Sequence, residues 1–506
     1  MARQQTRAPR RHPPPPSILE SDQRLSRSRL WQWQRDFFTE QGIAAWRQGI
    51  VPHYITSNPF IAQAYARVVL GFLRDSLADT RRPLDLRRPV YVIELGGGSG
   101  RFAYHFLQKF LPLWQQSRLH AIPITYVLTD FAARTVAYWQ AHPALQPFVA
   151  AGVLDFACYD LERDQHLTLL HSGVVLAPGT VANPLVVLAN YFFDSLPQDA
   201  FCVGDGRLCE SLVTLTSPTP EPEPPGLGIL ERVRVIYRPQ PAPAPYYDDP
   251  DLDAILQAYP AQVAATTWLF PSVALRGLRT LAALAGGRML LLSGDKGHIR
   301  EADVPDQAEP PLVVHGSISL PVNYHALAEY VRRAGGLVLH PPHVAAQLTV
   351  GAFLWGAPPD GFRETTLAYT AAIVQGGPDD FFMLKKAIEP YYDALTLEQL
   401  LAHLRLSGWD GNIFRGCFPA LLVQVRAGAI AEPTRQALYH AVQQIWALHY
   451  PIGEEPDLAM YLGLLMYELG YTPEARALFN TIEDSEDSEE PAAPPLGPRP
   501  VAASVP

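Results

Sequence analysis

The segment that most constrains this chain is an apolar run that leads directly into closely spaced glycines. Residues 90–95 read Val-Tyr-Val-Ile-Glu-Leu, Gly96, Gly98 and Gly100 follow, and a helical pattern begins at about Arg101. A buried strand, a glycine turn and a helix start let backbone N–H groups approach a negative or electron-rich ligand closely. The segment therefore predicts a site for a nucleotide-like cofactor. The alternative is a tight strand-to-helix turn that binds nothing.

Further short apolar runs follow this segment, separated by helical stretches. They are Ile124 to Leu128, Leu154 to Cys158, Leu185 to Ala189 and Met289 to Leu292. Strands joined by crossover helices build a parallel sheet with helices on both faces. We therefore predict an α/β, Rossmann-like fold. Strand patterns end near residue 360, and the amphipathic stretches beyond it predict an all-helical C-terminal region.

Proline clusters mark the expected boundaries, because 49 prolines gather at a few places in the chain. Proline-rich stretches are typical of linkers, insertions and tails. We predict a disordered basic and proline-rich tail at 1–20, an N-terminal helical segment at 21–89, a cofactor-binding domain at 90–360 with a proline-rich insertion at 214–250, a helical region at 361–480 that is partly tetratricopeptide-like, and a disordered acidic and proline-rich tail at 481–506.

Composition excludes several classes of partner. Forty Lys and Arg against fifty Asp and Glu give a formal charge of -10, which disfavours nucleic acid. No run approaches the ~20 apolar residues of a membrane helix, so we expect no membrane partner. Four cysteines without C-x-x-C spacing favour a reducing compartment. The histidines lack zinc-binding spacing, and no metal is predicted. We expect a cytoplasmic protein, with the mitochondrial matrix as the alternative that Arg3, Arg7, Arg10 and Arg11 suggest.

Two details indicate which cofactor the glycine turn holds. A dinucleotide fingerprint requires a third glycine where this chain has Arg101, which disfavours a nicotinamide cofactor. Glu94 lies two residues before the first glycine. A buried carboxylate repels a pyrophosphate and attracts an ammonium or sulfonium group. S-adenosylmethionine carries both cations and no phosphate, so it is the predicted cofactor.

Acids also end the next two predicted strands. Asp130 follows Ile124 to Thr129, and Asp160 follows the run that starts at Leu154. We predict that Asp130 binds the ribose hydroxyls and that Asp160 accepts a hydrogen bond from the adenine amino group. For each acid the alternative is a helix N-cap, which also favours aspartate.

These residues resemble known sequence motifs. The stretch from Glu94 to Gly100 looks like motif I of class I S-adenosylmethionine-dependent methyltransferases, which implies a seven-stranded sheet. Residues 189–197, Ala-Asn-Tyr-Phe-Phe-Asp-Ser-Leu-Pro, are similar to the "ANEFFDALP" signature of the MidA-like methyltransferases. Matches at 54–57, 201–213, 316–327 and 347–356 keep that family's order, and the resemblance covers roughly residues 50–385.

The resemblance implies methyl transfer, because mitochondrial members of that family modify a protein arginine in respiratory complex I assembly. Asn190 would accept a hydrogen bond from a substrate N–H, and Asp194 would orient or deprotonate an amine or guanidine, with a helix cap as the alternative role of Asp194. The family signature has glutamate where this chain has Tyr191. The first hypothesis is therefore methyl transfer to a protein side chain, with arginine as the candidate. The alternatives are a non-catalytic assembly protein that binds the cofactor and a small-molecule methyltransferase.

Overall fold

The computed structural model describes residues 16–204, 206–259, 267–300, 309–310, 312–357, 359–428 and 430–486. The chain divides into two compact units, and each is described by itself. The described parts of Met1–Pro390 and Leu406–Asp410 form the first unit. Those of Tyr391–Arg405 and Gly411–Pro506 form the second. All the predicted site residues belong to the first unit.

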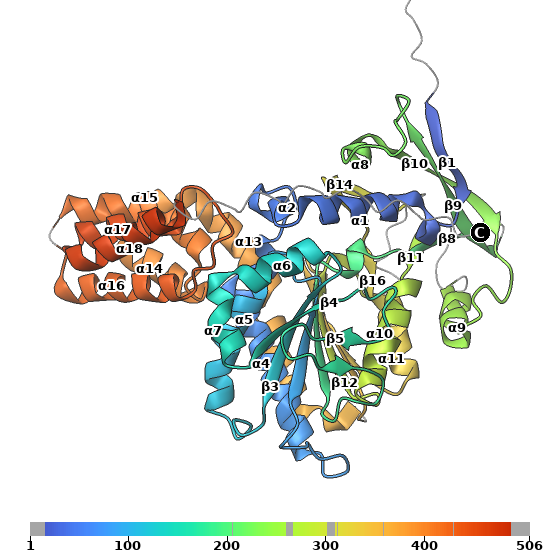
Figure 1. Ribbon diagram of the computed structural model, residues 1–506, viewed down its shortest axis with the longest axis horizontal. Helices are drawn as coiled ribbons and strands as arrows, with labels where there is room; N and C mark the ends of the chain where they lie inside the picture. Colours follow the sequence, from blue (N-terminus) through green and yellow to red (C-terminus); the bar gives the residue numbers. More distant parts are fainter. Residues whose placement is uncertain are drawn as a thin grey trace, which may run out of the picture. The chain divides into compact units, whose positions relative to one another are not determined.

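A seven-stranded mixed sheet forms the centre of the first unit (Figure 1). In spatial order its strands are β17 (Leu337–Leu339), β18 (Thr349–Trp355), β12 (Met289–Asp295), β7 (Leu185–Asn190), β2 (Val90–Leu95), β3 (Ile124–Asp130) and β4 (Leu154–Cys158). Every neighbouring pair from β12 to β4 is parallel, whereas β18 runs antiparallel to both β12 and β17. The predicted Rossmann-like sheet of seven strands is confirmed.

Strand β2 lies at the point where the order of the strands reverses. The chain goes from β2 to β3 and β4 on one side and later returns to β7 and β12 on the other. In open sheets of this kind, ligands bind beyond the carboxyl ends of the strands that flank such a switch point. The glycine turn follows β2 directly, so the fold puts it at that crevice.

Two helical layers cover the sheet. These helices are α4 (Pro59–Ala78), α5 (Arg101–Gln115), α6 (Ala133–Ala141), α7 (Gln146–Ala150), α10 (Ser272–Leu284), α11 (Tyr324–Arg333) and α12 (Arg363–Tyr369). Tyr91, Ile93 and Leu95 of β2 share one core with the apolar residues of α10 and α11, because successive side chains of a strand point to opposite faces. α4 contacts α5, α12 and β12.

A second, antiparallel sheet forms beside the first. It contains β1 (Ser17–Gln23), β8 (Asp199–Gly204), β9 (Arg207–Ser217), β10 (Arg234–Pro241) and β11 (Thr267–Phe270). β9 pairs with β8, β1 and β10. Part of the predicted insertion at 214–250 is therefore sheet. Its prolines are tolerated because β10 is an edge strand that pairs only with β9.

The predicted tails lie largely outside the described residues. Ser17–Glu20 and Thr481–Glu486 are inside, and the structure places them in β1 and at the end of α18 (Thr472–Glu486). For these two short stretches the prediction of disorder was wrong. β1 pairs with β9, whose residues lie about 190 positions away in the chain, so local composition carried no sign of it.

The N-terminal helices lead from β1 to the central sheet. They are α1 (Arg29–Gln41), α2 (Ala44–Arg47) and α3 (Tyr54–Ser57), after the short turn η1 (Leu25–Arg27). Ser28 caps α1 by accepting from the N–H of Leu30. Trp31, Trp33 and Phe37 of α1 pack against apolar residues of β9. Figure 1 shows α1 running across the end of the central sheet.

Short elements complete the first unit. They are β5 (Leu167–Thr168), β6 (Val175–Leu176), β13 (Gly297–His298), β14 (Val313–His315), β15 (Ser317–Ser319), β16 (Val322–Asn323), α8 (Ile229–Arg232), α9 (Pro250–Ala258), α13 (Pro378–Ile388), the 3-10 turns η2 (Pro143–Leu145), η3 (Phe193–Ser195) and η6 (Pro359–Gly361), and the π-helical turn η7 (Thr370–Val374). Two of them, η3 and the β14–β15 hairpin, contribute residues to the pocket described below.

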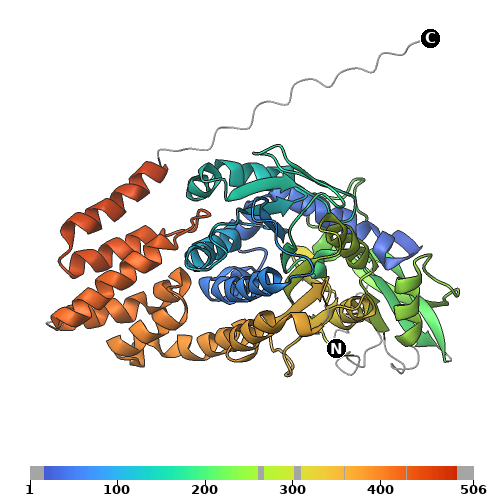
Figure 2. The same cartoon turned by 90° about the horizontal axis from the view of Figure 1, so that it is seen from below.

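The second unit is helical, as predicted. After the turn η8 (Glu389–Ala394) it contains α14 (Leu397–Leu406), α15 (Gly411–Ala427), α16 (Glu432–Ala447), α17 (Leu458–Glu468) and α18, drawn in orange to red in Figures 1 and 2. α17 contacts α15, α16 and α18. A Cβ on Gly463 would lie 2.5 Å from Cε1 of Phe479, so this glycine permits the close approach of α17 and α18. In the part of the chain that the structure describes, no helix could span a membrane.

Candidate cofactor and transfer site

The glycine turn between β2 and α5 follows a backbone path that favours glycine. Gly96, Gly98 and Gly100 have φ angles of 61°, 53° and 80°, where a side chain would be strained. A Cβ on Gly96 would also lie 2.7 Å from Cδ2 of Phe192. Gly100 is the N-cap residue of α5. The turn thus leads directly to the N-terminal end of that helix, where Arg101 N–H donates to Ser99 Oγ at 3.4 Å.

Glu94 is buried immediately before this turn. Its side chain is only 5% exposed, and the hydroxyl of Tyr126 donates a hydrogen bond of 2.7 Å to Oε2. Burial raises the pKa of Glu94 to about 8, because a charged carboxylate loses its hydration there. The carboxyl group is therefore mostly protonated at neutral pH. A cation bound beside it would favour the ionised form.

Asp130 ends β3, the strand beside β2. Its side chain is 7% exposed, and Oδ1 accepts from the N–H of Ala132 at 2.9 Å. Asp130 is not the helix N-cap that the sequence also allowed, because the N-cap residue of α6 is Ala132 and no side chain caps that helix. Burial raises the pKa of Asp130 to about 6, so the group is mostly ionised at pH 7. It also lines the pocket, and backbone hydrogen bonds from Ala132, Gly98 and Phe131 lower its pKa against the effect of burial.

Asp160 faces the same pocket but is paired. Its Oδ2 accepts from the guanidinium of Arg35 in α1 at 2.5 Å, and its Oδ1 accepts from the N–H of Glu162 at 3.1 Å. The Arg35 guanidinium also lies 4.4 Å from the ring centre of Phe131. The predicted contact of Asp160 with adenine stays a prediction. Arg35 binds Asp160 at this place in the pocket. The sequence did not predict that Arg35 would be part of the site.

Asn190 and Tyr191 follow the end of β7. Asn190 Oδ1 accepts from the hydroxyl of Tyr65 at 2.8 Å, and its Nδ2 donates to the carbonyl of Thr56 at 3.5 Å. Its amide is therefore already engaged by the N-terminal helices. Tyr191 has a φ of 46°, a conformation that costs about 1–3 kcal/mol for a residue with a side chain. The strain falls at the position where the family signature has glutamate.

Asp194 lies in η3 beside a second buried acid, Asp295. Its Oδ1 accepts from the hydroxyl of Ser195 at 2.9 Å, and its N–H donates to Asp295 Oδ2 at 3.1 Å. Asp295 Oδ1 accepts from the N–H of Lys296 at 2.8 Å. Burial raises the pKa of Asp194 to about 7, and burial together with the charge of Asp194 raises the pKa of Asp295. Near neutral pH the two carboxyl groups hold at least one proton between them.

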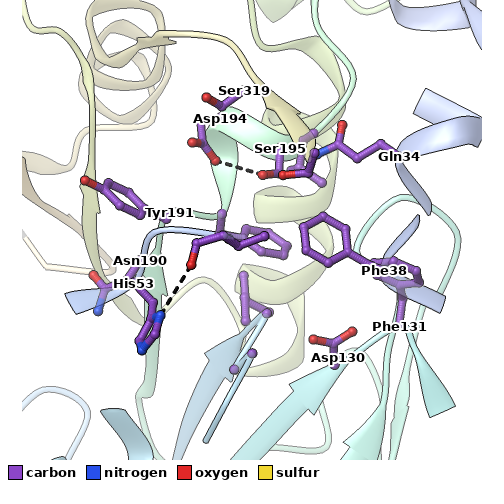
Figure 3. A pocket seen from close by; sticks show the side chains of 18 of the residues that line it. Gln34, Phe38, His53, Asp130, Phe131, Asn190, Tyr191, Asp194, Ser195 and Ser319 are labelled. Atoms are coloured by element: carbon purple, nitrogen blue, oxygen red, sulfur yellow. Dashed lines mark hydrogen bonds between the residues drawn. The ribbon is translucent and has the colours of Figure 1, made fainter. Parts of the chain in front are cut away.

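One pocket brings the predicted residues together (Figure 3). Those that line it are Glu94, Gly96, Gly98, Asp130, Asp160, Asn190 and Asp194. Gly100 is outside the lining, at the start of α5. Phe192 forms part of the pocket wall, whereas Phe193 is 1% exposed and packs in the core.

Sequence reasoning missed several residues of this pocket. Lys296 lines it and Asp295 lies behind Asp194, and both come at the end of β12. The sequence did contain a pattern that indicates these residues, because Asp295 ends an apolar strand as Asp130 does. No sequence pattern near the pocket residues of α1 and α2 predicted that they would line the pocket. They are Trp31, Gln34, Arg35, Phe38 and Trp46.

The side chains around the glycine turn fit S-adenosylmethionine. The lining residues 94–99 include the carboxyl group of Glu94 and no lysine or arginine, so they offer no positive charge to a pyrophosphate. An ammonium or sulfonium group would instead be attracted. Asp130 offers an acceptor for ribose hydroxyls on the neighbouring strand. Among the described residues, no cluster of three or more His, Cys, Asp or Glu side chains could hold a metal ion.

Comparisons with known proteins agree with this chemistry. Residues 75–264 match the family described as "Putative S-adenosyl-L-methionine-dependent methyltransferase". A segment of 132 residues is 23% identical to a probable polyketide synthase of Dictyostelium discoideum. That match covers 26% of this chain and 5% of the synthase, so the chain spans a small part of that relative.

Solved structures from Burkholderia thailandensis are also similar. An uncharacterized protein has 14% identity and a TM-score of 0.41 over 69% of this chain and 90% of its own. Another member of its superfamily, bound to S-adenosyl-homocysteine, has 18% identity and a TM-score of 0.34 over 56% of this chain and 63% of its own. Residues 75–264 of this chain are thus identified as a putative S-adenosyl-L-methionine-dependent methyltransferase region.

Proposed function

We propose that this protein binds S-adenosylmethionine at the carboxyl ends of β2 and β3 and directs methyl transfer to a nucleophile held beside residues 190–197. The observation that carries the proposal is the single pocket that joins the two groups of residues. Glu94 and Asp130 line it on the cofactor side, and Asn190 and Asp194 line it on the other. The segments that carry them lie about 60 to 100 positions apart in the chain.

Three features would hold the cofactor. The carboxylate of Glu94 attracts a cation, the N–H groups around the turn at Gly96 and Gly98 approach the ligand, and Asp130 accepts from ribose hydroxyls. When bound, S-adenosylmethionine supplies a methyl group on a positively charged sulfur, which is already a strong electrophile. The protein therefore needs mainly to hold the nucleophile in line and to exclude water.

The other side of the pocket can orient the acceptor and take up its proton. Asp194 is exposed to the pocket and becomes ionised above about pH 7, so it can serve as a base near neutral pH. Asp295 accepts from the N–H of Asp194 and so fixes the position of η3. Asn190 is held by Tyr65, which makes it part of the pocket wall and a weaker candidate for a direct contact.

Two classes of methyl acceptor are candidates, a protein side chain and a small molecule. The MidA-like signature supports a protein side chain, with arginine as the first example, although Tyr191 replaces the acid that would suit a guanidinium. The enclosure of the pocket supports a small molecule instead. Five residues of α1 and α2 line the pocket opposite the strand ends, which leaves less room for a folded protein surface.

Calorimetry and labelled methyl transfer test this function. The full chain should bind S-adenosylmethionine and transfer its tritium-labelled methyl group to a component of cell extract. Gly98→Trp should abolish binding, because the new side chain would fill the turn beside Trp46. Gly286→Trp is the matched control, since Gly286 has a similar φ of 58° and a Cβ there would meet no other atom within 4 Å. Binding without transfer would favour the non-catalytic alternative, and absence of binding in the unchanged chain would contradict the proposal.

A further inference from the structure

Lys296 is a basic side chain of the pocket that pairs with no acid in the described chain. Among the described residues that line the pocket, Arg35 and Lys296 are the two with a lysine or arginine side chain. Arg35 pairs with Asp160 at 2.5 Å, whereas Lys296 forms no ion pair with a described residue. Lys296 is also exposed, so its long side chain leaves the ammonium group accessible to a ligand in the pocket.

Backbone hydrogen bonds hold Lys296 beside Asp194. Lys296 directly follows β12, and its carbonyl accepts from the N–H of Val322 at 2.8 Å. The carbonyl of Asp194 accepts from the N–H of Leu320, two residues earlier, at 3.0 Å. One short segment of chain therefore bonds to both residues. A Cβ on Gly297 would overlap the carbonyl oxygen of Val322, so glycine permits the close approach that keeps Lys296 in this place.

The surroundings of Lys296 belong to the acceptor side of the pocket. Figure 3 shows Ser319, which directly precedes that short segment, on the same side as Asp194 and away from Asp130. Burial raises the pKa of Asp194, and the charge of Lys296 opposes this effect. Burial lowers the pKa of His315, which also lines the pocket, and Lys296 lowers it further. A group that pairs with Lys296 would therefore be part of the methyl acceptor and not part of the cofactor's ribose.

The charges on this side suit a ligand group with one negative charge. Lys296 supplies one positive charge, which repels a guanidinium or ammonium group. His315 is mostly uncharged at neutral pH because its pKa is lowered. Asp194 is partly ionised near pH 7, so it would repel a phosphate monoester, whose charge of nearly two Lys296 compensates only in part. A carboxylate carries the single charge that Lys296 balances.

We propose that Lys296 is a specificity-determining residue whose ammonium group pairs with the carboxylate of a small-molecule methyl acceptor. This inference rests on the proposed function and narrows its substrate class. The acceptor places its carboxylate at Lys296 and its N–H or O–H nucleophile toward the methyl group. As the bond from the nucleophile to the methyl carbon forms, the bond from that carbon to sulfur breaks and its electron pair stays on sulfur. The acceptor's proton leaves to the ionised carboxylate of Asp194.

The test uses the full chain, tritium-labelled S-adenosylmethionine and cell extract, which ultrafiltration separates into a protein retentate and a small-molecule filtrate. An anion-exchange resin at pH 7 then divides the filtrate into a retained and an unretained fraction. We expect labelled product with the retained fraction as the source of the acceptor. Treatment of that fraction with alkaline phosphatase should leave the yield unchanged, because a carboxylate is not a phosphate ester.

Substitutions of Lys296 test the role of its charge. Lys296→Met should raise the half-saturating amount of the retained fraction about tenfold, as expected for a lost hydrogen bond between charged groups. With this fraction in excess, the rate should fall only about twofold, because the remaining effect is on the pKa of Asp194. Lys296→Arg keeps the charge and should stay closer to the unchanged chain. Lys386→Met, at an exposed lysine outside the pocket lining, is the control and should have no effect.

Several outcomes would overturn the inference. Equal losses in Lys296→Met and Lys296→Arg would show that the acceptor does not use the charge. A lower affinity of Lys296→Met for S-adenosylmethionine, measured by calorimetry, would assign the lysine to the cofactor's own carboxylate. Labelled product from the unretained fraction or in the retentate, or its loss after phosphatase treatment, would exclude the carboxylate acceptor and leave the proposed function intact. Label in no fraction would contradict both.

Discussion

The two sides of the pocket differ in where their side chains find partners. On the cofactor side, Glu94 and Asp130 are bound by Tyr126 and Ala132, which lie within 32 positions of them in the chain. On the acceptor side, Asn190 is bound by a residue 125 positions away, and Asp194 by one 101 positions away. Apart from Asp160, which pairs with Arg35, 125 positions away, the cofactor side is thus built mainly from one local stretch of sheet. The acceptor side is assembled from distant segments, and this explains why a short motif identifies the cofactor but not the substrate.

If the two sides of the pocket are independent, a substitution on one side should leave the function of the other side unchanged. The largest effect is expected for Asp130→Ala, because it removes the acceptor proposed for two ribose hydroxyls. Each hydrogen bond to a charged group contributes about 1.5–3 kcal/mol, so we expect a loss of about a hundredfold in affinity for S-adenosylmethionine by calorimetry. Asp248→Ala, at an exposed aspartate, is the control. An unchanged affinity in Asp130→Ala would remove Asp130 from the cofactor site.

The next effect concerns pH and Glu94. The carboxyl group has a pKa of about 8 without ligand, and a bound cation selects its ionised form, so binding must release a proton at pH 7. The affinity for S-adenosylmethionine should therefore rise roughly tenfold from pH 6 to 7, where the cofactor's own amino group is still mostly protonated. Calorimetry in buffers of different ionisation enthalpy measures the released proton. Glu94→Gln should abolish most of this dependence, and an affinity that falls with rising pH would contradict the role of Glu94.

The smallest effect is expected on the acceptor side. The positive charge of Lys296 lowers the pKa of Asp194 against the effect of burial, so Lys296→Met should raise that pKa above about 7. Ionised Asp194 is the form that accepts a proton, hence methyl transfer at pH 7 should fall about twofold and its acid limb should move to higher pH. Lys386→Met, at an exposed lysine, is the control. A change in affinity for S-adenosylmethionine in Lys296→Met would show that the two sides are coupled.

Much of the fold followed from local patterns. The strand predicted at 90–95 has those bounds, and the apolar runs that start at Ile124, Leu154, Leu185 and Met289 are all strands of the central sheet. Such prediction succeeds because a strand buried on both faces needs a continuous apolar run. β1 was not foreseen as part of a sheet, since an edge strand gains its partner from elsewhere in the chain and carries a weaker pattern of its own.

The residues of the candidate site also divide into those that the sequence predicted and those that it did not. The sequence alone determined the glycine turn and the acids at the strand ends, because a positive φ and a strand-to-helix turn depend on neighbouring residues. Only the tertiary structure decided that α1 lies across the pocket, that Arg35 pairs with Asp160, and that Gln34 donates to the carbonyl of Ile318. Those contacts join segments more than 100 positions apart, and burial, charge and hydrogen bonding at such contacts depend on how the helices pack, which no local spacing of residues encodes.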